Sequence, residues 1–574
     1  MIILNTIVIN HNNNKIEITT KYLILRFFLI TLFNKNHMGK MNKFDLQTDV
    51  NQTAISMASP ALTDIPANDT YVTDVTYTMN YKPEINPLLI ELAFLCAGLK
   101  PPQINTACEL GFGQGLSLNF HATGSTVSWF GNDFNKKHAL FARELNTVSQ
   151  SGCHISAQSF REFCARDDLP VFDFICLHGI WSWIDDPNRT IITDFIKRKL
   201  RDGGVVYMSY NALPGMTELL PMRKILTEHA NLASQSNIDF VDRITNAIDF
   251  AESLLKTNPR FSTVYPNVVQ RLDQIRDQPK NYLAHEYFNS EWKPFHFSDV
   301  SAEMVEAGLQ FACSANLLDH FNAVYLNPEQ LEFLSSIQDI TMRENMRDFM
   351  INQQFRADYW VKGAKKLTTE QRNKRIRALR VMLVKKSQSV RNDILTYMGP
   401  ATFHTNLFEP IIAALSDHEP YSIASIEQAI KGSAIEFEQL VEIIALLVTK
   451  EDLVLVNSEA VIEQVSERCH RLNSYLLARS KMRDDVNYLL SPVSGGGVLV
   501  PNDEQLFLVA LRRGLKKPSE WANYAWDVGY SNAGGILSGI SGSTMPKSFE
   551  VELMKHVYEW AENKLPILYA LGIR

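Results

Sequence analysis

The stretch ACELGFGQGLSLNF, residues 107–120, decides the fold because a glycine loop separates two apolar runs. Gly111, Gly113 and Gly115 alternate with larger residues, and Glu109 stands just before them. An apolar run that ends in such a loop predicts a strand, a tight turn and then a helix. Glycine at three alternate positions also predicts a backbone that a ligand approaches closely, with a plain tight turn as the alternative.

The residues after this stretch alternate between strand and helix patterns up to about residue 215. The strand patterns are TVSWFGND, HISAQSF, VFDFICLHGIWSWI and GVVYMSYNALPG, and two of the helix patterns between them are KKHALFARELNTVSQ and RTIITDFIKRKLRDG. Strands that alternate with helices predict a parallel sheet. We therefore expect the α/β fold class, with a Rossmann-like core.

Two acidic residues at the expected strand ends narrow the choice of ligand. Glu109 ends the first strand, and Asp133 ends the next one, 24 residues later. A loop of this kind holds either the pyrophosphate of a dinucleotide or the amino-acid end of S-adenosylmethionine (AdoMet). A carboxylate at Glu109 would repel pyrophosphate and attract the ammonium of AdoMet, and Asp133 would accept the ribose hydroxyls. We therefore predict AdoMet as the cofactor, with a dinucleotide or a structural turn as alternatives.

The fourth strand ends in HGIWSW, and ligands of such sheets bind at the carboxyl ends of the strands. His178 would border the reacting group, where it either relays a proton or hydrogen-bonds the loop. Trp181 and Trp183 would wall an acceptor channel, with core packing as the alternative for each. Of the tyrosines at positions 71, 77 and 81 in the entry loop, we expect one at the site, and Tyr77 is the candidate.

Two groups of motifs resemble known families. ELGFGQG, GNDF and FDFICLHGIWSWI resemble class I AdoMet-dependent methyltransferases, and residues 258–308 resemble the methyltransferase regulatory domain of a bacterial subset. The combination is similar to the rickettsial protein-lysine methyltransferases that modify an outer-membrane autotransporter, outer membrane protein B. The resemblance covers roughly residues 71–574 and is looser toward the C-terminus.

The resemblance implies roles for the site residues. It places the methionine moiety against Glu109, Gly111, Gly113 and Gly115, the ribose against Asp133, the adenine against Ser159 and Phe160, and the methyl group against His178 and Gly179. Phe134 is a further expected cofactor-binding residue. It also implies a lysine-bearing, extended or unfolded protein as the acceptor. Monomethylation and trimethylation both stay open, with trimethylation as our expectation. The chain lacks an NPPY-type tetrapeptide and an obvious pair of metal-binding carboxylates, so we expect no metal site.

The pattern along the chain divides it into seven segments. We expect an Asn- and Ile-rich N-terminal extension (1–40), an AdoMet-binding core (69–215), a helical insertion (216–292), the end of the core (293–327), a helical middle region (328–398), a winged-helix-like region (399–470) and a C-terminal helical domain (471–574). For the extension we keep three interpretations: a start at Met38 or Met41, a disordered leader, or a targeting segment.

Composition and charge bear on location and partners. A net charge of −7 disfavours nucleic acid and anionic membranes as partners. The apolar run in the extension, residues 22–33, is shorter than the roughly twenty residues that span a membrane. Seven cysteines without a CxxC pair indicate a reducing compartment, and the resemblance to bacterial enzymes implies that this is the bacterial cytoplasm.

More than half of the chain lies outside the expected core, which favours a macromolecular acceptor. We expect the insertion to form a homodimer. Residues 361–386 carry ten Lys or Arg against one Glu and would either dock an acidic protein or form a solvated helix face. The rival interpretations are a small-molecule methyltransferase with accessory domains and a non-catalytic AdoMet-binding interaction protein.

Overall fold

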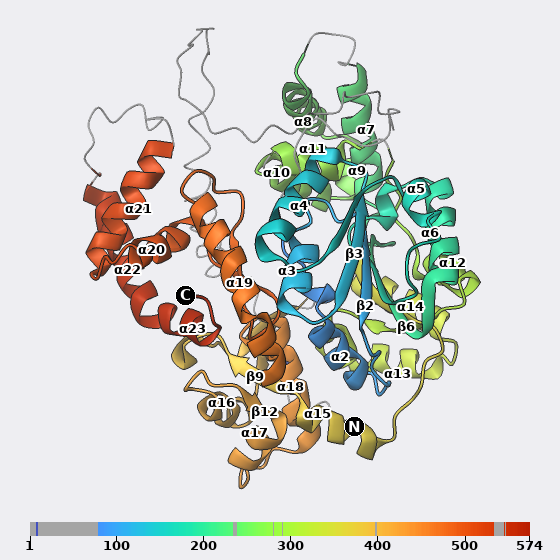
Figure 1. The fold of residues 1–574 in the computed structure, drawn as a ribbon. Helices are drawn as coiled ribbons and strands as arrows, with labels where there is room; N and C mark the ends of the chain where they lie inside the picture. Colours follow the sequence, from blue (N-terminus) through green and yellow to red (C-terminus); the bar gives the residue numbers. More distant parts are fainter. Residues whose placement is uncertain are drawn as a thin grey trace.

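A seven-stranded sheet lies at the centre of the α/β core (Figure 1). The structure is a computed structural model that describes residues 7–9, 79–232, 238–278, 280–289, 291–396, 399–532, 545 and 547–574. The strand order is β4-β3-β2-β5-β6-β8-β7. In chain order the strands are β2 (Thr106–Leu110), β3 (Ser128–Asp133), β4 (His154–Ala157), β5 (Phe172–Leu177), β6 (Leu200–Asn211), β7 (Gln310–Ser314) and β8 (Phe355–Val361). Only β8 runs antiparallel to its neighbours in this sheet, which confirms the expected α/β class.

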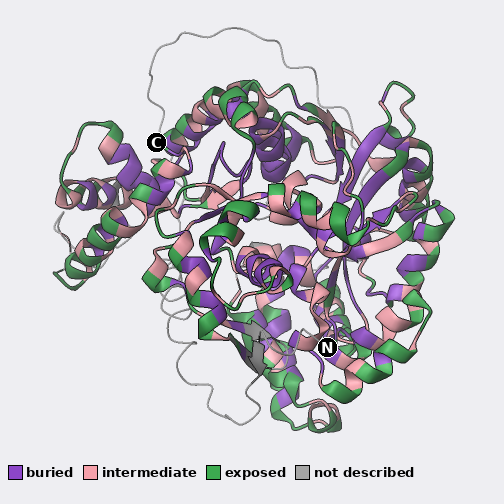
Figure 2. Ribbon diagram, turned by 90° about the horizontal axis from the view of Figure 1, so that it is seen from below, coloured by how far each residue is buried: buried purple, intermediate pink, exposed green. Residues whose placement is uncertain are grey.

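Helices cover both faces of the sheet (Figure 1). The helices of one face are α2 (Pro87–Cys96), α3 (Leu116–Gly124) and α4 (Lys136–Ser149), and those of the other are α5 (Phe160–Cys164), α6 (Asp186–Lys199) and α12 (Phe297–Glu306). Neighbouring strand residues belong to different cores, since Ala107 packs in the cluster of α2 and Cys108 in that of α6. A parallel sheet covered on both faces needs apolar strands, and β5 is buried along its whole length. Figure 2 shows such buried strands beneath helices with exposed outer faces.

A helical insertion follows the carboxyl end of β6. Its helices are α7 (Leu219–Leu232), α8 (Phe240–Lys256), α9 (Arg260–Val264), α10 (Asn267–Arg276) and α11 (Lys280–Tyr287). They enclose an apolar core of their own, which includes Leu226, Ile248 and Leu272. The two ends of the insertion meet where the Leu213 N–H donates to the Phe295 carbonyl at 2.9 Å. The insertion therefore leaves and rejoins the core at the carboxyl edge of the sheet.

The range 328–398, which the sequence predicts as helical, is mixed. It contains α13 (Pro328–Ser336), α14 (Ile340–Ile351) and α15 (Thr369–Ala378), but also β8, β9 (Arg380–Leu383) and β10 (Asp393–Thr396). β8 is hidden in the sequence because FRADYWV carries two charges. Arg356 and Asp358 are both buried and form an ion pair at 2.9 Å, so they interrupt the apolar run that usually marks an inner strand.

The winged helix that the sequence predicts for 399–470 is not confirmed. The segment holds α16 (Thr405–Ala414), β12 (Tyr421–Ser422), α17 (Ile423–Ala429), α18 (Phe437–Thr449), β13 (Leu453–Leu455) and the start of α19 (Glu459–Arg479). We expected LVLVNSEAVIEQV to form a hairpin, but only its first part is a strand. Ser458 precedes a helix whose apolar residues Val461 and Val465 are four apart, so helical spacing prevails. β13 pairs instead with β9, in a small sheet of order β12-β9-β13.

The rest of the described chain is mostly helical. It consists of β1 (Ile7–Ile9), β11 (Gly399–Phe403), β14 (Tyr488–Leu490), β15 (Gly497–Leu499), α20 (Asn502–Arg512), α21 (Pro518–Asn532), α22 (Lys547–Asn563) and α23 (Leu565–Ala570), besides short 3₁₀ turns. Of the N-terminal extension, only β1 lies within the described residues, and it pairs with β11. No helix among the described residues has the length and apolar character needed to cross a bilayer.

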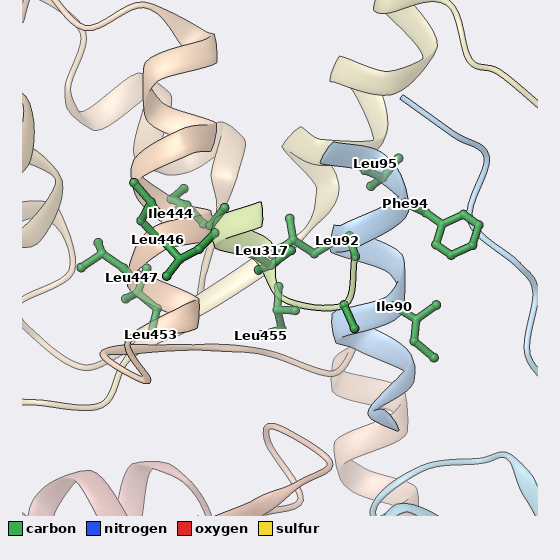
Figure 3. Close-up of a cluster of buried hydrophobic side chains, with 14 of the residues drawn as sticks. Ile90, Leu92, Phe94, Leu95, Leu317, Ile444, Leu446, Leu447, Leu453 and Leu455 are labelled. Atoms are coloured by element: carbon green, nitrogen blue, oxygen red, sulfur yellow. The ribbon is translucent and has the colours of Figure 1, made fainter. Parts of the chain in front are cut away.

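The C-terminal half shares an apolar core with the α/β core. Figure 3 shows Leu92 of α2 and Leu446 of α18 on either side of Leu317, which belongs to the short turn η5 (Leu317–His320). All three side chains belong to one buried cluster. The helices after residue 399 are therefore part of the same packed body as the sheet.

A glycine hairpin makes a second contact between the two halves. The turn between β14 and β15 lies so close to the end of α3 that a Cβ on Gly495 would lie 2.8 Å from the Gly124 carbonyl oxygen. A Cβ on Gly497 would lie 2.7 Å from the Tyr81 ring, so the hairpin presses on the segment that leads into the core. Beside it, Arg468 of α19 donates to the Thr123 carbonyl at 2.8 Å.

The basic segment 361–386 is largely paired within the chain. Its ion pairs are Lys362–Asp202, Arg372–Glu438, Arg377–Glu427, Arg380–Glu459, Lys385–Asp452 and Lys386–Glu562. Six of the ten basic side chains thus bind this chain's own carboxylates. This pairing weakens the interpretation of the segment as a docking site for an acidic protein.

Candidate functional site

Three predicted site residues lie at the same level of the sheet. β2 pairs with β3 so that Leu110 faces Asn132, and with β5 so that Glu109 faces Cys176. The next residues in these registers, Gly111, Asp133 and His178, therefore meet at the carboxyl edge, although 67 residues separate the first from the last. The sheet brings these predicted residues together as the sequence pattern implies.

The three glycines of the loop serve two different purposes. All have positive φ, at 69°, 59° and 70° in chain order, which larger residues rarely adopt. A Cβ on Gly111 would lie 2.5 Å from the Ile180 side chain, and one on Gly115 would lie 2.6 Å from the Cβ of Ala142. These two glycines allow close packing inside the protein. Only Gly113 has no atom within 4 Å of its would-be Cβ, so only this glycine leaves room for a ligand.

Glu109 is a buried carboxyl group with an unused oxygen. The residue is 4% exposed, and among the described residues its Oε2 has no hydrogen-bond partner. Burial raises the Glu109 pKa to about 8, and the charge of Asp133 adds to the rise, while the Lys82 ammonium opposes it. A buried acceptor without a partner is unfavourable, so this oxygen is suited to a cationic ligand.

Asp133, in contrast, is held by backbone donors. Its Oδ2 accepts the Gly113 N–H and its Oδ1 accepts the Asn135 N–H, each at 2.9 Å. The imidazole Nδ1 of His138 lies 3.4 Å from Oδ1. The carboxylate therefore fixes the glycine loop, and each oxygen keeps a lone pair for a hydroxyl donor.

Three further predicted residues follow strands β3 and β4. Phe134 comes directly after β3, and Ser159 and Phe160 come after β4. The Ser159 hydroxyl caps α5, where it accepts the Glu162 N–H at 3.3 Å and donates to the Glu162 carboxylate at 2.9 Å. A Cβ on Gly111 would lie 3.4 Å from Phe160, so this ring borders the glycine loop. Phe134, directly after Asp133, is half-buried.

His178 is oriented by a tyrosine that the sequence did not single out. Its Nδ1 lies 2.9 Å from the Tyr207 hydroxyl of β6, and the two rings are nearly parallel. Burial, and to a lesser degree the Lys82 ammonium, hold the His178 pKa well below its usual range, so the ring is neutral at physiological pH. Gly179 donates its N–H to Ser209 at 2.8 Å and has open space beyond its Cα.

The two tryptophans occupy different environments. Trp181 is fully buried in the apolar cluster of α6, so it lines no open channel. Trp183 is half-buried and packs against Trp292, with ring centroids 6.3 Å apart. The Arg223 guanidinium lies over the Trp292 ring at 4.7 Å, so the insertion supports this loop. Tyr77 lies outside the described residues.

A cavity of about 810 Å³ adjoins the glycine loop. Its lining includes Gln114, which follows Gly113, and Asn135 and His138 beside Asp133. Tyr475 and Met482 line the opposite wall, from α19 and the residues after it. In the part of the chain that is described, no group of three or more His, Cys, Asp or Glu side chains is arranged to hold a metal ion.

The chain is similar to a known protein family and to proteins from bacteria. The family model for the predicted methyltransferase regulatory domain matches residues 279–362. The uncharacterized protein sll1526 of Synechocystis sp. is 34% identical over 515 residues, which cover 88% of this chain and 99% of that protein. The uncharacterized protein RP789 of Rickettsia prowazekii is 26% identical over 286 residues, 47% of this chain and 49% of that protein.

A solved structure shares the whole fold. PKMT2 from Rickettsia typhi, in complex with AdoHcy, is 15% identical and superposes with a TM-score of 0.60, covering 86% of this chain and 100% of that chain. At this identity the likeness shows that the two chains have a similar fold. The chain belongs to the same family as the Synechocystis protein, with a class I methyltransferase fold and a methyltransferase regulatory domain.

Proposed function

We propose that the chain is an AdoMet-dependent protein-lysine N-methyltransferase. The observation that carries the cofactor assignment is the buried Glu109 carboxyl, whose Oε2 has no partner, beside the open face of Gly113. The AdoMet ammonium would bind Glu109, and the ribose hydroxyls would bind the free lone pairs of Asp133. The Rickettsia typhi structure, in complex with AdoHcy, supports this assignment.

When bound, AdoMet supplies a methyl group on its sulfonium: the lone pair of the acceptor amine would form the new N–C bond as the C–S bond breaks, and the thioether AdoHcy would leave. A lysine has an ordinary pKa of about 10.4 and must lose its proton first. The neutral His178 ring stands at the carboxyl edge with one nitrogen held by Tyr207. The protein contributes positioning and exclusion of water, and the lysine gives up its proton to solvent before it enters the site.

The acceptor that we propose is a lysine of an outer-membrane autotransporter of the outer membrane protein B type, with trimethylation as the end point. The resemblance to rickettsial protein-lysine methyltransferases supports this choice. So does the large part of the chain outside the core, which exceeds the needs of a small acceptor. A bacterial cytoplasmic location and a homodimer through the insertion complete the proposal.

The experiment combines labelled AdoMet, the full-length chain and an unmethylated recombinant autotransporter passenger, followed by peptide mass spectrometry. Label on lysine side chains would support the proposal, and the number of methyl groups would give the product. Intact AdoMet binding without transfer to the passenger would overturn the acceptor. Transfer to a metabolite extract would then favour the small-molecule rival, and absence of any transfer would favour a non-catalytic AdoMet-binding protein.

A further inference from the structure

We propose that the Lys82 ammonium binds the α-carboxylate of the cofactor's methionine moiety, opposite Glu109. This inference rests on the proposed function, because it assigns a second contact in the same cofactor site. Lys82 lies in the segment that enters the core and not in any of the strand-end motifs. Three observations support this role of Lys82: the position of its backbone, the charged groups near it, and the charges of the ligand.

The backbone of Lys82 is fixed over the first turn of α3. Its N–H donates to the Ser117 hydroxyl at 2.9 Å, and its carbonyl lies 3.2 Å from Nε2 of His121. Ser117 is the second residue of the helix that begins after the glycine loop. Lys82 is therefore anchored directly beside the loop that leaves room for the ligand.

The backbone of Lys82 indicates the direction of its side chain. Its backbone is extended, with φ −119° and ψ 100°, as expected before Pro83. Successive side chains of an extended segment point to opposite sides. Tyr81 turns toward the C-terminal hairpin, where its ring packs against Phe120 and Tyr488. Lys82 then faces away from that hairpin.

The charges around Lys82 agree with this direction. Its ammonium lowers the pKa of Glu109 and of His178, which stand at two adjacent strand ends. It also lowers the pKa of Glu84, although burial leaves that pKa raised overall. Within the described part of the chain, the Lys82 ammonium forms no ion pair at close range. A half-buried cation near the strand ends, without a close partner, is suited to an anionic group of a ligand.

The ligand has the matching set of charges. The amino-acid end of AdoMet carries an ammonium and a carboxylate on the same carbon, besides the sulfonium. Two carboxylates and one ammonium line the site, and they oppose the net single positive charge of the cofactor. Glu109 alone would accept the ammonium and leave the carboxylate beside a second acid, Asp133. Lys82 removes that repulsion.

The test uses ligands that differ in the carboxylate. Calorimetry would measure AdoMet, decarboxylated AdoMet and methylthioadenosine against the full-length wild-type chain, Lys82→Gln, Lys82→Arg and the exposed control Lys374→Gln. We expect Lys82→Gln to weaken AdoMet binding about 10- to 100-fold, the range for a charge-assisted hydrogen bond. Decarboxylated AdoMet and methylthioadenosine should bind Lys82→Gln as they bind wild type. Lys82→Arg should recover most of the AdoMet affinity, and Lys374→Gln should change nothing.

Two outcomes would overturn the inference. An equal loss for AdoMet and decarboxylated AdoMet in Lys82→Gln would show that Lys82 does not contact the carboxylate. A loss that extends to methylthioadenosine would show that Lys82 only supports the local fold. In both cases wild-type binding of AdoMet leaves the proposed function standing. A wild-type chain that binds none of the three ligands would overturn the proposed function itself, and this inference with it.

Discussion

At the scale of single residues, two carboxyl groups stand at neighbouring strand ends in very different states. Asp133 accepts two backbone N–H groups, whereas Oε2 of Glu109 has no partner. The first therefore shapes the loop whether or not a ligand is present. The second keeps an oxygen open for the proposed ligand, and burial together with the Asp133 charge raises its pKa.

We expect Glu109→Gln to remove the pH dependence of AdoMet binding. The Glu109 pKa is about 8, so at lower pH the free site holds a proton that an incoming ammonium must displace. Wild-type affinity should rise from pH 6 to 8, at most tenfold per unit, and level off above. Glu109→Gln should bind about 10- to 100-fold more weakly at pH 8. Calorimetry across this range checks it, with Glu228→Gln as an exposed control, and an unchanged pH profile in the variant would contradict it.

The same pKa has a consequence for the stability of the cofactor-free chain. The folded-state pKa of Glu109 lies above the ordinary value of 4.5, so the folded chain binds this proton more tightly than the unfolded chain does. The contribution of Glu109 to stability is therefore fully present below pH 4.5 and is lost as the pH rises through 8. Thermal melts of wild type and Glu109→Gln should converge at low pH, with the variant more stable at pH 8.

Tyr207 is a positioning residue for His178. We expect Tyr207→Phe to lower kcat about 2- to 10-fold, since it removes one hydrogen bond from the imidazole. The KM for AdoMet should stay near the wild-type value, and the pH–rate profile should shift. Tyr359→Phe is the matched control, because that hydroxyl donates to the Glu84 carbonyl at 2.5 Å and not to a histidine. Equal effects of the two substitutions would refute a specific role for Tyr207.

At the scale of elements, two glycines of the loop differ in role: Gly115 allows close packing, whereas Gly113 leaves room for a ligand. We expect Gly115→Ala to lower the free energy of unfolding by about 2–4 kcal/mol, because positive φ and the Ala142 contact both oppose a Cβ. Gly113→Ala should lower the free energy of unfolding by only about 1–2 kcal/mol, because positive φ alone opposes a Cβ at this position. It should raise the KM for AdoMet more strongly than Gly115→Ala does. Urea denaturation and steady-state kinetics check the pair, and the reverse ranking would be inconsistent with it.

Strands whose apolar sequence matches their burial between two layers of helices were predictable from the sequence. The strands β2, β3 and β5 read as apolar runs because both faces of the sheet are covered. β8 was missed because it carries two buried charges, Arg356 and Asp358, which pair with each other and with side chains of α14 and β6. The hairpin expected after residue 452 was wrong because β13 finds its partner in β9, about 70 residues earlier.

For the candidate site, the sequence predicted which residues meet at one edge of the sheet. Glu109, Asp133 and His178 end strands, so their meeting at one edge follows from the topology of a parallel sheet. Lys82 and Tyr207 carry no such signal. One lies in an irregular entry segment and the other within a long buried strand, so only the packed structure shows what they face.

At the scale of the whole molecule, the shared apolar core predicts a single unfolding unit. Leu317 lies between Leu92 and Leu446, and truncating it should weaken the sheet and the C-terminal helices together (Figure 3). We expect Leu317→Ala to cost about 2–5 kcal/mol and to leave one cooperative transition among these parts. Calorimetry of thermal unfolding checks this, with the exposed Leu232→Ala as a control. A C-terminal transition separate from that of the sheet would contradict it.

The glycine hairpin that presses on Tyr81 and Gly124 has a consequence for how this chain evolves. An α/β core that packs against a hairpin about 370 to 420 residues downstream is not freely exchanged with other accessory domains by recombination. Its lineage should inherit core and C-terminal helices as one piece. The alignment with the Synechocystis protein, which extends over 99% of that protein, has the form that such joint inheritance leaves.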